Sequence, residues 1–339
     1  IPFSHSKIVS AGMQFPKGFA NRVFHGWFVW TKIENYNGRE AYVMAFAPRE
    51  ECDESLLPPL PDEVNAVVGK TAGIYLFETL APRITRMSFI QQADMKGSIP
   101  QFVMNSMLSS SLNIVERLVD TFKRKGTDVD REMRMAFVDN IPNAPPITAN
   151  QRALVAECFD LENAVNGEFK EIESKSHRVK MFRKVDRSNG KIRTIGKAVA
   201  RVDASPADIL AWRCDWCSND KMQIHREDPN SISRSVIKEL SMNESILETT
   251  KKLPFPFKNR EFVNRSMWIG PNPDDGSFLF FWEPHLALVS EVSSSSSAKR
   301  SVRAESVGFM RIVPLPEPDS SEFTVIQFVD VNGYVPVWV

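Results

Sequence analysis

The chain has 339 residues, of which 42% are hydrophobic and 25% are charged, so its composition is that of a globular protein and excludes a disordered or collagen-like chain. The 42 Lys and Arg residues balance the 42 Asp and Glu residues; this net charge of zero gives no support to a nucleic-acid-binding surface, and we expect no nucleic-acid partner. The chain has 23 Phe but only 4 Tyr, which predicts an interior of large apolar groups without hydroxyls.

The N-terminal residues 1–5 lack the basic start and apolar run of a signal peptide, and no run of 18 apolar residues occurs. We therefore expect a cytoplasmic location, with peripheral contact at membranes. The four cysteines are too few for a disulfide framework in a chain of this length, which favours a reducing compartment. They are Cys52, Cys158, Cys214 and Cys217.

A long internal repeat is visible. Residues 89–103 (FIQQADMKGSIPQFV) and 325–339 (VIQFVDVNGYVPVWV) share identical residues at an offset of 236, among them Asp94/Asp330 and Gly97/Gly333. Gly73 and Leu80 match Gly308 and Leu315 at an offset of 235. Phe19, Asn21 and Arg22 match Phe262, Asn264 and Arg265 at an offset of 243. Three blocks in one order predict a duplicated domain.

In the first copy, aromatic and β-branched residues predict strands at 19–30, 40–48, 73–80 and 84–93. Asn37-Gly38 predicts a hairpin turn, and the three prolines within 49–66 predict a loop. From Pro100 to about 124 the apolar residues recur every three or four positions, which predicts a long amphipathic helix.

Residues 125–147 are charged and then Pro-rich and are interpreted as a linker. A helix is expected at about 149–164, a hairpin around Ser188-Asn189-Gly190, and a helix after Ser205-Pro206. Further strands are expected at 233–241, 260–269, 277–283, 303–313 and 323–330, with a mobile Ser-rich loop at 290–301.

Four segments resemble motifs of one known family. Residues 202–212 (VDASPADILAW) are similar to the family's strand-to-helix passage, and 254–263 (PFPFKNREFV) to its Pro-x-Pro and Asn-Arg-Asp-Phe segment, with Glu for Asp. Arg303-Ala304-Glu305 resembles the short stretch after the family's lid loop. Residues 92–100 (QADMKGSIP) resemble the segment that opens its final helix. The family that these segments resemble is that of the START lipid-transfer domains.

The resemblance implies an α+β helix-grip fold, in which a curved antiparallel sheet surrounds a long C-terminal helix and leaves an apolar tunnel for one lipid. It also implies a fragment of a multi-START protein in two partial copies: 1–124 as the C-terminal part of a first domain, and 148–339 as a second domain without its last helix. The first copy departs from the motifs, with Lys17-Gly18-Phe19-Ala20 at the expected Arg-Asp-Phe element and Val68-Gly69-Lys70 near the Arg-Ala-Glu stretch.

In the second copy we expect the tunnel to be lined by polar and by aromatic or sulfur-containing side chains. The polar candidates are Glu248, Arg265 and Arg303; for the two arginines, surface cross-strand pairs are the alternative. The apolar candidates are Trp268, Phe280, Trp282 and Met310, for which core packing is the alternative.

No catalytic or metal-binding constellation is visible. Cys214-Asp215-Trp216-Cys217 is a CxxC without a second ligand pair, so the thiols are interpreted as structural and neither a metal nor a cofactor is expected. Residues 290–301, with Lys299 and Arg300, are a candidate membrane-touching gate, or a plain flexible linker.

The function predicted from these features is the binding, and by extension the transfer, of one sterol, phospholipid or sphingolipid, without catalysis. One alternative is a helix-grip enzyme, such as a cyclase or hydrolase, that uses Glu283, His285 and Asp330. Another is a degenerate domain that serves as an interaction module. The oligomeric state is not predicted.

Overall fold

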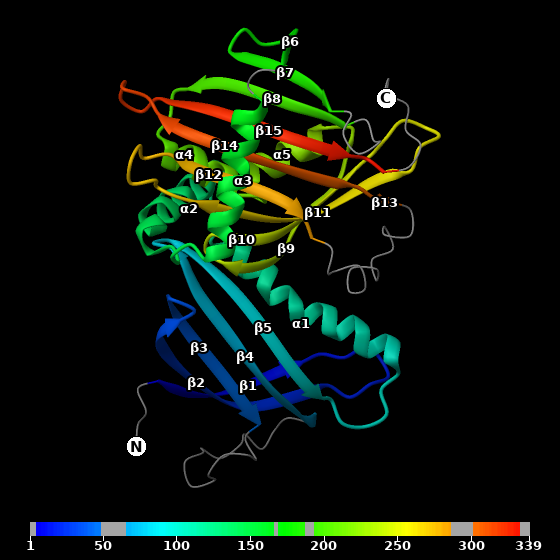
Figure 1. Ribbon diagram of the computed structural model, residues 1–339. Helices are drawn as coiled ribbons and strands as arrows, with labels where there is room; N and C mark the ends of the chain where they lie inside the picture. The colour runs from blue at the N-terminus through cyan, green and yellow to red at the C-terminus, as the bar shows by residue number, and fades with distance from the viewer. Residues whose placement is uncertain (1–4, 49–65, 166–168, 187–192, 286–300, 333–339) are drawn as a thin grey trace. The chain divides into compact units, whose positions relative to one another are not determined.

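In the computed structural model the chain divides into two units, Ile1–Met133 and Arg134–Val339. The structure describes residues 5–48, 66–165, 169–186, 193–285 and 301–332 (Figure 1). Both units combine antiparallel sheet with helices, so the predicted α+β class is confirmed. In the described part of the chain, no helix is long and apolar enough to cross a membrane.

Unit 1 is built on a sheet in the order β1-β2-β3-β4-β5. The hairpin between β2 and β3 turns at Asn37-Gly38, where both residues have positive φ, and Asn35 Oδ1 accepts a hydrogen bond of 2.9 Å from the Gly38 amide. Asn and Gly are the residues that adopt this conformation at low cost, so the predicted turn is confirmed. The strands are β1 (Ser6–Met13), β2 (Arg22–Tyr36), β3 (Arg39–Pro48), β4 (Val67–Ala81) and β5 (Ile84–Asp94).

The predicted long helix is α1 (Gln101–Thr121), which follows Pro100 directly. Its first turn packs into a small core, where Val103 joins Phe15, Phe24 and Met95. Further along, Val119 is 62% exposed, so the apolar stripe of this helix is not covered over its whole length.

The segment expected to be a linker contains helix α2 (Gly126–Asn140) and a short 3-10 turn, Ile141–Asn143. Phe137 and Ile141 pack into the main core of unit 2, and the division between the units falls inside α2. The Pro-rich composition that indicated a linker therefore marks only the end of this segment, and its second half is part of unit 2.

Unit 2 is built on a sheet in the order β6-β7-β8-β15-β14-β12-β11-β10-β9, with β13 parallel to β11. Helix α3 (Ala149–Val165) packs on one face, against Phe281 and Phe309. Helix α4 (Pro206–Cys214) packs on the other, against Trp268 and Phe280 (Figure 1). The remaining elements are β6 (Lys170–Ile172), β7 (Val179–Asp186), β8 (Arg193–Val202), α5 (Asn219–Glu227), β9 (Ser231–Ser241), β10 (Glu244–Lys251), β11 (Asn259–Ile269), β12 (Phe278–Pro284), β13 (Ser301–Arg303), β14 (Glu305–Pro314) and β15 (Ser321–Asp330).

Among the elements that were not predicted, three have sequences that lack a clear apolar period. Strand β10 has only Ile246 and Leu247 as large apolar residues, yet it lies between β9 and β11 and is held by pairing on both sides. Strand β1 is a mostly exposed edge strand. Helix α5 is strongly polar and begins after Ser218.

The five strands of unit 1 and five strands of unit 2 have the same order and register. The order β1-β2-β3-β4-β5 corresponds to β10-β11-β12-β14-β15. The pair Met13–Arg22 corresponds to Lys251–Arg260. Trp30–Met44 and Trp268–Phe280 are likewise equivalent pairs. The parallel contact of β2 with β4 has its counterpart in β11 with β13.

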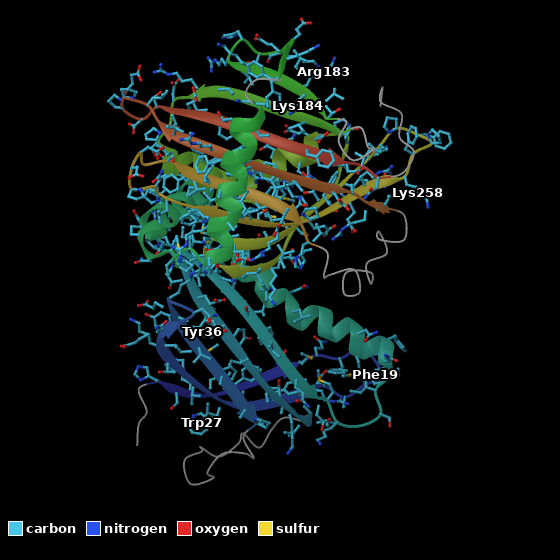
Figure 2. All side chains as sticks on the ribbon, viewed as in Figure 1. Phe19, Trp27, Tyr36, Arg183, Lys184 and Lys258 are labelled. Carbon is cyan, nitrogen blue, oxygen red and sulfur yellow. The ribbon has the colours of Figure 1, made fainter. Side chains whose placement is uncertain are left out.

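One buried arginine makes the same contacts in both units. Arg22 donates to the carbonyls of Ala20, Met95 and Lys96. Arg260 donates to the carbonyls of Lys258, Val331 and Asn332. These arginines follow the loops that contain Phe19 and Lys258, which Figure 2 labels.

The third block of the repeat was therefore aligned wrongly. The structure pairs Arg22 with Arg260, at an offset of 238, and not with Arg265. At this offset FPKGFANR (15–22) matches LPFPFKNR (253–260), so unit 1 does contain the Asn-Arg-x-Phe element that the sequence comparison did not find there. Arg303 of the Arg-Ala-Glu stretch ends β13 and Glu305 begins β14; by the strand pairing, Val68-Gly69-Lys70 takes the place of this stretch in unit 1.

A glycine inside the sheet marks a close contact in each unit. A Cβ atom on Gly308 would lie 2.4 Å from the Trp282 ring and 2.6 Å from the Ile326 carbonyl oxygen. A Cβ atom on Gly73 would lie 2.5 Å from both the Phe46 ring and the Ile90 carbonyl oxygen. The aromatic ring of the neighbouring strand thus lies directly over a residue without a side chain.

We expect Gly308→Ala to destabilise unit 2 by about 1–3 kcal/mol, because the added methyl group must displace Trp282 or the backbone. The measurement is urea denaturation followed by tryptophan fluorescence. Gly196→Ala in β8 is the matched control, since nothing lies within 4 Å of the Cβ position there. Equal loss of stability in both variants would contradict this account.

We expect Arg260→Met to lower the free energy of unfolding by at least about 2 kcal/mol, because it leaves carbonyl groups near β15 without their donor. Arg201→Met is the control, because Arg201 is more exposed and its ion pair with Glu317 is a surface pair. Thermal denaturation monitored by circular dichroism measures the stability of both variants. A control variant as unstable as Arg260→Met would argue against a special role for this arginine.

Candidate functional site

The register of the sheet determines which side chains of unit 2 face α4. Successive residues of a strand point to opposite faces. On β11, Phe262, Asn264, Ser266 and Trp268 therefore share one face, and Trp268 places that face against the core that contains α4. The intervening Met267 packs on the α3 side.

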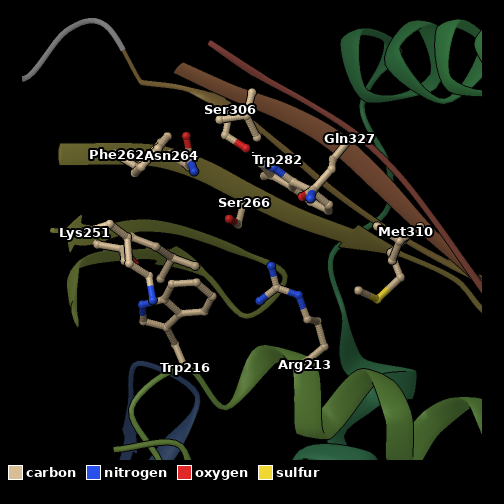
Figure 3. A pocket seen from close by; sticks show the side chains of 14 residues that line it. Arg213, Trp216, Lys251, Phe262, Asn264, Ser266, Trp282, Ser306, Met310 and Gln327 are labelled. Atoms are coloured by element: carbon tan, nitrogen blue, oxygen red, sulfur yellow. Dashed lines mark hydrogen bonds between the residues drawn. The ribbon is translucent and has the colours of Figure 1, made fainter. Parts of the chain in front are cut away.

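A cavity of about 390 Å³ lies on the α4 side of this sheet (Figure 3). This volume falls at the small end of the range of ligand pockets, roughly 300–1,000 Å³. Its apolar lining consists of Leu247, Phe262, Trp282, Met310, Val325 and Val329. Its uncharged polar lining consists of Trp216, Thr249, Asn264, Ser266, Ser306 and Gln327. The charged residues of the lining are Arg213 and Lys251.

Helix α4 places Arg213 at this cavity. The helix starts after Ser205, whose hydroxyl accepts a hydrogen bond of 3.2 Å from the Asp208 amide, and Pro206 occupies its first turn. Leu210 is completely buried, and Arg213 lies three residues later on the same side of the helix. The buried face of α4 therefore ends in a guanidinium group.

The guanidinium of Arg213 lies among aromatic rings. Its central carbon is 4.2 Å from the ring centre of Phe280, 5.0 Å from that of Trp216 and 5.7 Å from that of Trp282. Arg234 also lies on Trp216, at 3.7 Å, and its Nε donates to the Trp216 carbonyl at 2.7 Å. These cation–π contacts are favourable, and more so where the cation is removed from water.

Lys221 is a second buried cation next to this group. Its ammonium donates to the carbonyls of Trp212 and Arg213, and it lies 4.3 Å from the Trp212 ring centre. Burial lowers the pKa of Lys221 to about 7, and the neighbouring cations Arg213 and Arg234 act in the same direction. Burial also lowers the pKa of Arg213 to about 10, so its guanidinium remains charged at neutral pH.

The acidic residues near the base of the cavity are held by a different arginine. Arg134 contacts Asp215 at 3.2 Å and Asp220 at 2.7 Å. The Ser218 hydroxyl also donates to Asp220, at 2.6 Å. The turn between α4 and α5 is thus fixed by Arg134, which belongs to the segment expected to be a linker.

Some polar groups of the lining are hydrogen-bonded within the described part of the protein, and others are not. Trp282 Nε1 donates to the Ser306 hydroxyl at 2.9 Å, and both residues are buried. In contrast, Trp216 Nε1 and Asn264 Oδ1 are buried without a hydrogen-bond partner among the described residues. Buried polar groups are nearly always paired, so these two atoms are places where a bound molecule can hydrogen-bond.

Four of the seven residues predicted from the sequence lie on the cavity side of the sheet. Trp282 and Met310 line the cavity. Trp268 and Phe280 belong to the adjoining buried core, where Phe280 lies under the Arg213 guanidinium. The alternative interpretation as core packing therefore describes Trp268, whose Nε1 donates to the Met242 carbonyl at 3.3 Å.

The three polar candidates do not line the cavity, and this part of the prediction needs correction. Glu248 lies between the lining residues Leu247 and Thr249 on β10, so its side chain points to the other face of the sheet. There it accepts hydrogen bonds from Ser233 and Ser235. Arg265 pairs across strands with Glu244 at 2.5 Å and Glu283 at 3.6 Å. Arg303 pairs with Glu261 at 3.0 Å. The two arginines thus form the cross-strand pairs given as their alternative, and the parity of the strands points all three side chains away from the cavity.

The main residue that sequence reasoning missed is Arg213. A signal was present: on the predicted helix, Ile209, Leu210 and Arg213 fall on one side at spacings of three and four residues. A cation on the apolar side of a helix indicates a buried charge. Asn264 and Ser266 were missed because the strand parity was not determined by the sequence.

The residues of the enzymatic alternative do not come together in the cavity. Glu283 contacts Arg265, while the His285 carbonyl accepts a hydrogen bond from Arg303. Asp330 accepts one from the Asn332 amide. Among the described residues, no group of His, Cys, Asp and Glu is arranged to hold a metal ion. Burial raises the pKa of the Cys214 thiol to about 12, which makes it unreactive. The candidate gate at 290–301 lies almost wholly outside the described residues.

No family model and no curated protein matches the chain. Solved structures similar to it include the lipid transfer and protein localization domain of human StarD13, with 18% identity over 57% of this chain and 88% of that chain, at a TM-score of 0.40. Human STARD10 has 20% identity over 57% and 72%, at a TM-score of 0.41. Human StAR-related lipid transfer protein 5 has 16% identity over 56% and 85%, at a TM-score of 0.41. These names belong to the group that the sequence motifs resemble.

We expect the stability of unit 2 to rise with pH between about 7 and 8.5 through Lys221. Its pKa in the folded state, about 7, is below its ordinary value of 10.5, so in this range the folded state releases the proton while the unfolded state still holds it, and the free energy of unfolding rises with pH. Chemical denaturation of the wild type and Lys221→Met across this range measures the effect. The rise should be absent from the variant and kept by Lys252→Met, an exposed control. Parallel pH profiles of wild type and Lys221→Met would contradict it.

Proposed function

We propose that unit 2 binds one lipid-like molecule in the cavity between its sheet and α4, without catalysis, and passes it between membranes. The observation that carries this proposal is the cavity itself: most of its surface is apolar, although eight of its fourteen lining residues carry a polar or charged group. Such a lining suits a hydrophobic ligand, since removal of apolar surface from water contributes about 25 cal/mol per Å².

The lining also argues against hydrolysis or cyclisation. General acid–base catalysis needs a titratable group within reach of the ligand. Among the described residues, the cavity has no carboxylate and no histidine; its charged residues are Arg213 and Lys251. An interaction module with a filled interior is also less well supported, because the side chains leave about 390 Å³ unfilled.

We further propose that the two units are copies of one domain. The support is the shared strand order, the equivalent cross-strand pairs and the arginine that makes the same contacts in each. The sheet of unit 1 would then be followed by the long helix of the domain, α1. The predicted domain limits of 1–124 and 148–339 would move, since α2 contributes to the core of unit 2.

Gln327→Trp tests lipid binding. Gln327 lines the cavity but is itself exposed, so a larger side chain there can fill the space without straining the core. We expect at least a tenfold weaker affinity for a fluorescent lipid offered in vesicles, about 1.4 kcal/mol or more. Native mass spectrometry should show one lipid per wild-type chain.

Val307→Trp is the matched control, because Val307 is exposed and lies on β14 between Ser306 and Gly308, facing away from the cavity. It should bind lipid as the wild type does. Undiminished binding by Gln327→Trp would show that the cavity is not where the lipid lies, and an absence of lipid binding by the wild type would reject the proposed function.

A further inference from the structure

The guanidinium of Arg213 faces the cavity without a partner that balances its charge. In the described part of the chain, no carboxylate pairs with it and no acceptor takes a hydrogen bond from it; its neighbours are the rings of Phe280, Trp216 and Trp282. Figure 3 shows the group reaching from α4 toward Ser266 on the sheet. A charge held among apolar groups ordinarily needs a counter-charge.

The carboxylates of this region that could have balanced the charge of Arg213 already pair with another cation. Asp215 and Asp220 pair with Arg134. Lys251, the other cation of the lining, pairs with Asp228 at 2.7 Å, so its charge is balanced. Among the charged lining residues that the structure describes, Arg213 is therefore the one without a counter-charge, and the nearby guanidinium of Arg234 adds to the positive potential.

The uncharged donors of the lining fit the same kind of ligand group. Trp216 Nε1 is buried with no acceptor among the described residues, and its ring lies beside the Arg213 guanidinium. The Ser266 hydroxyl, on a residue only 4% exposed, lies on the opposite wall (Figure 3). Guanidinium, indole and hydroxyl groups all donate hydrogen bonds, and charge-assisted bonds from a guanidinium to an oxyanion are strong.

We infer that the ligand of this cavity is an acidic single-chain amphiphile whose oxyanion, a carboxylate or a phosphate monoester, pairs with Arg213 while its alkyl chain lies along Val325 and Val329. This inference rests on the proposed lipid-binding function and names the chemical class of the ligand. The cavity volume of about 390 Å³ favours one alkyl chain over the two of a phospholipid.

Three probes that share a dodecyl chain test the inference by isothermal titration calorimetry on the whole 339-residue chain: dodecanoate, dodecyl phosphate and dodecanol. We expect the wild type to bind at least one of the two anions about tenfold or more tightly than dodecanol. Arg213→Met should remove that preference and leave the affinity for dodecanol unchanged or higher. If dodecanoate binds more tightly the natural head group is a carboxylate, and if dodecyl phosphate does it is a phosphate monoester.

Two further variants keep the test decisive. Arg213→Gln is also neutral but polar, so it carries the same expectation if the Met variant is poorly folded, which thermal denaturation reports. Arg265→Met removes a cation from the other face of the sheet and should keep the preference for anions.

The possible failures can be told apart. Equal affinity of the wild type for dodecanol and both anions would overturn the inference and leave the proposed function standing, as would a preference for anions that survives in both Arg213 variants. If none of the three probes binds, or if binding is unaffected by Gln327→Trp, the inference is overturned together with the assignment of lipid binding to this cavity.

Discussion

The pairing register of β11, β12, β14 and β15 is the constraint on which the rest of unit 2 depends. Because side chains alternate along a strand, one register places Phe262, Asn264 and Ser266 toward α4 and sends Arg265 to the opposite face, where it pairs with Glu244. Slippage by a single residue would put arginine and glutamate into the core. Gly308 helps to prevent such a slip, since the Trp282 ring fits over this position only because it has no side chain.

The sheet alone does not form a site; the site is completed by the segment between α4 and α5. That segment is held from below by the ion pairs of Arg134 and from within by Lys221, which binds the last carbonyls of α4. The cost of burying several cations is reduced by the rings of Trp212 and Trp216. These contacts fix the base of the cavity, and the guanidinium of Arg213 points from it toward the space that a ligand would occupy.

The comparison of the two units shows which features belong to the scaffold and which to the site. The buried arginines Arg22 and Arg260 make equivalent contacts in the two units, and so do the glycines Gly73 and Gly308. These residues therefore stabilise the sheet and do not bind a ligand. The pair Glu261–Arg303 is replaced by Val23 and Val68 in unit 1, which shows that an ion pair at this place is not needed for the strand pairing.

The sequence by itself determined the class of the fold, most of the strands, both long helices and the Asn37-Gly38 turn, because these follow from local periodicity and turn chemistry. It also pointed to Trp282 and Met310, which line the cavity. It did not reveal β10, whose few apolar residues are held by pairing on both sides, nor α2, whose role depends on the core it joins. Only the tertiary structure decided the parity of the strands, the true offset of 238 between Arg22 and Arg260, and the isolation of Arg213, because each depends on groups far apart in the chain coming together.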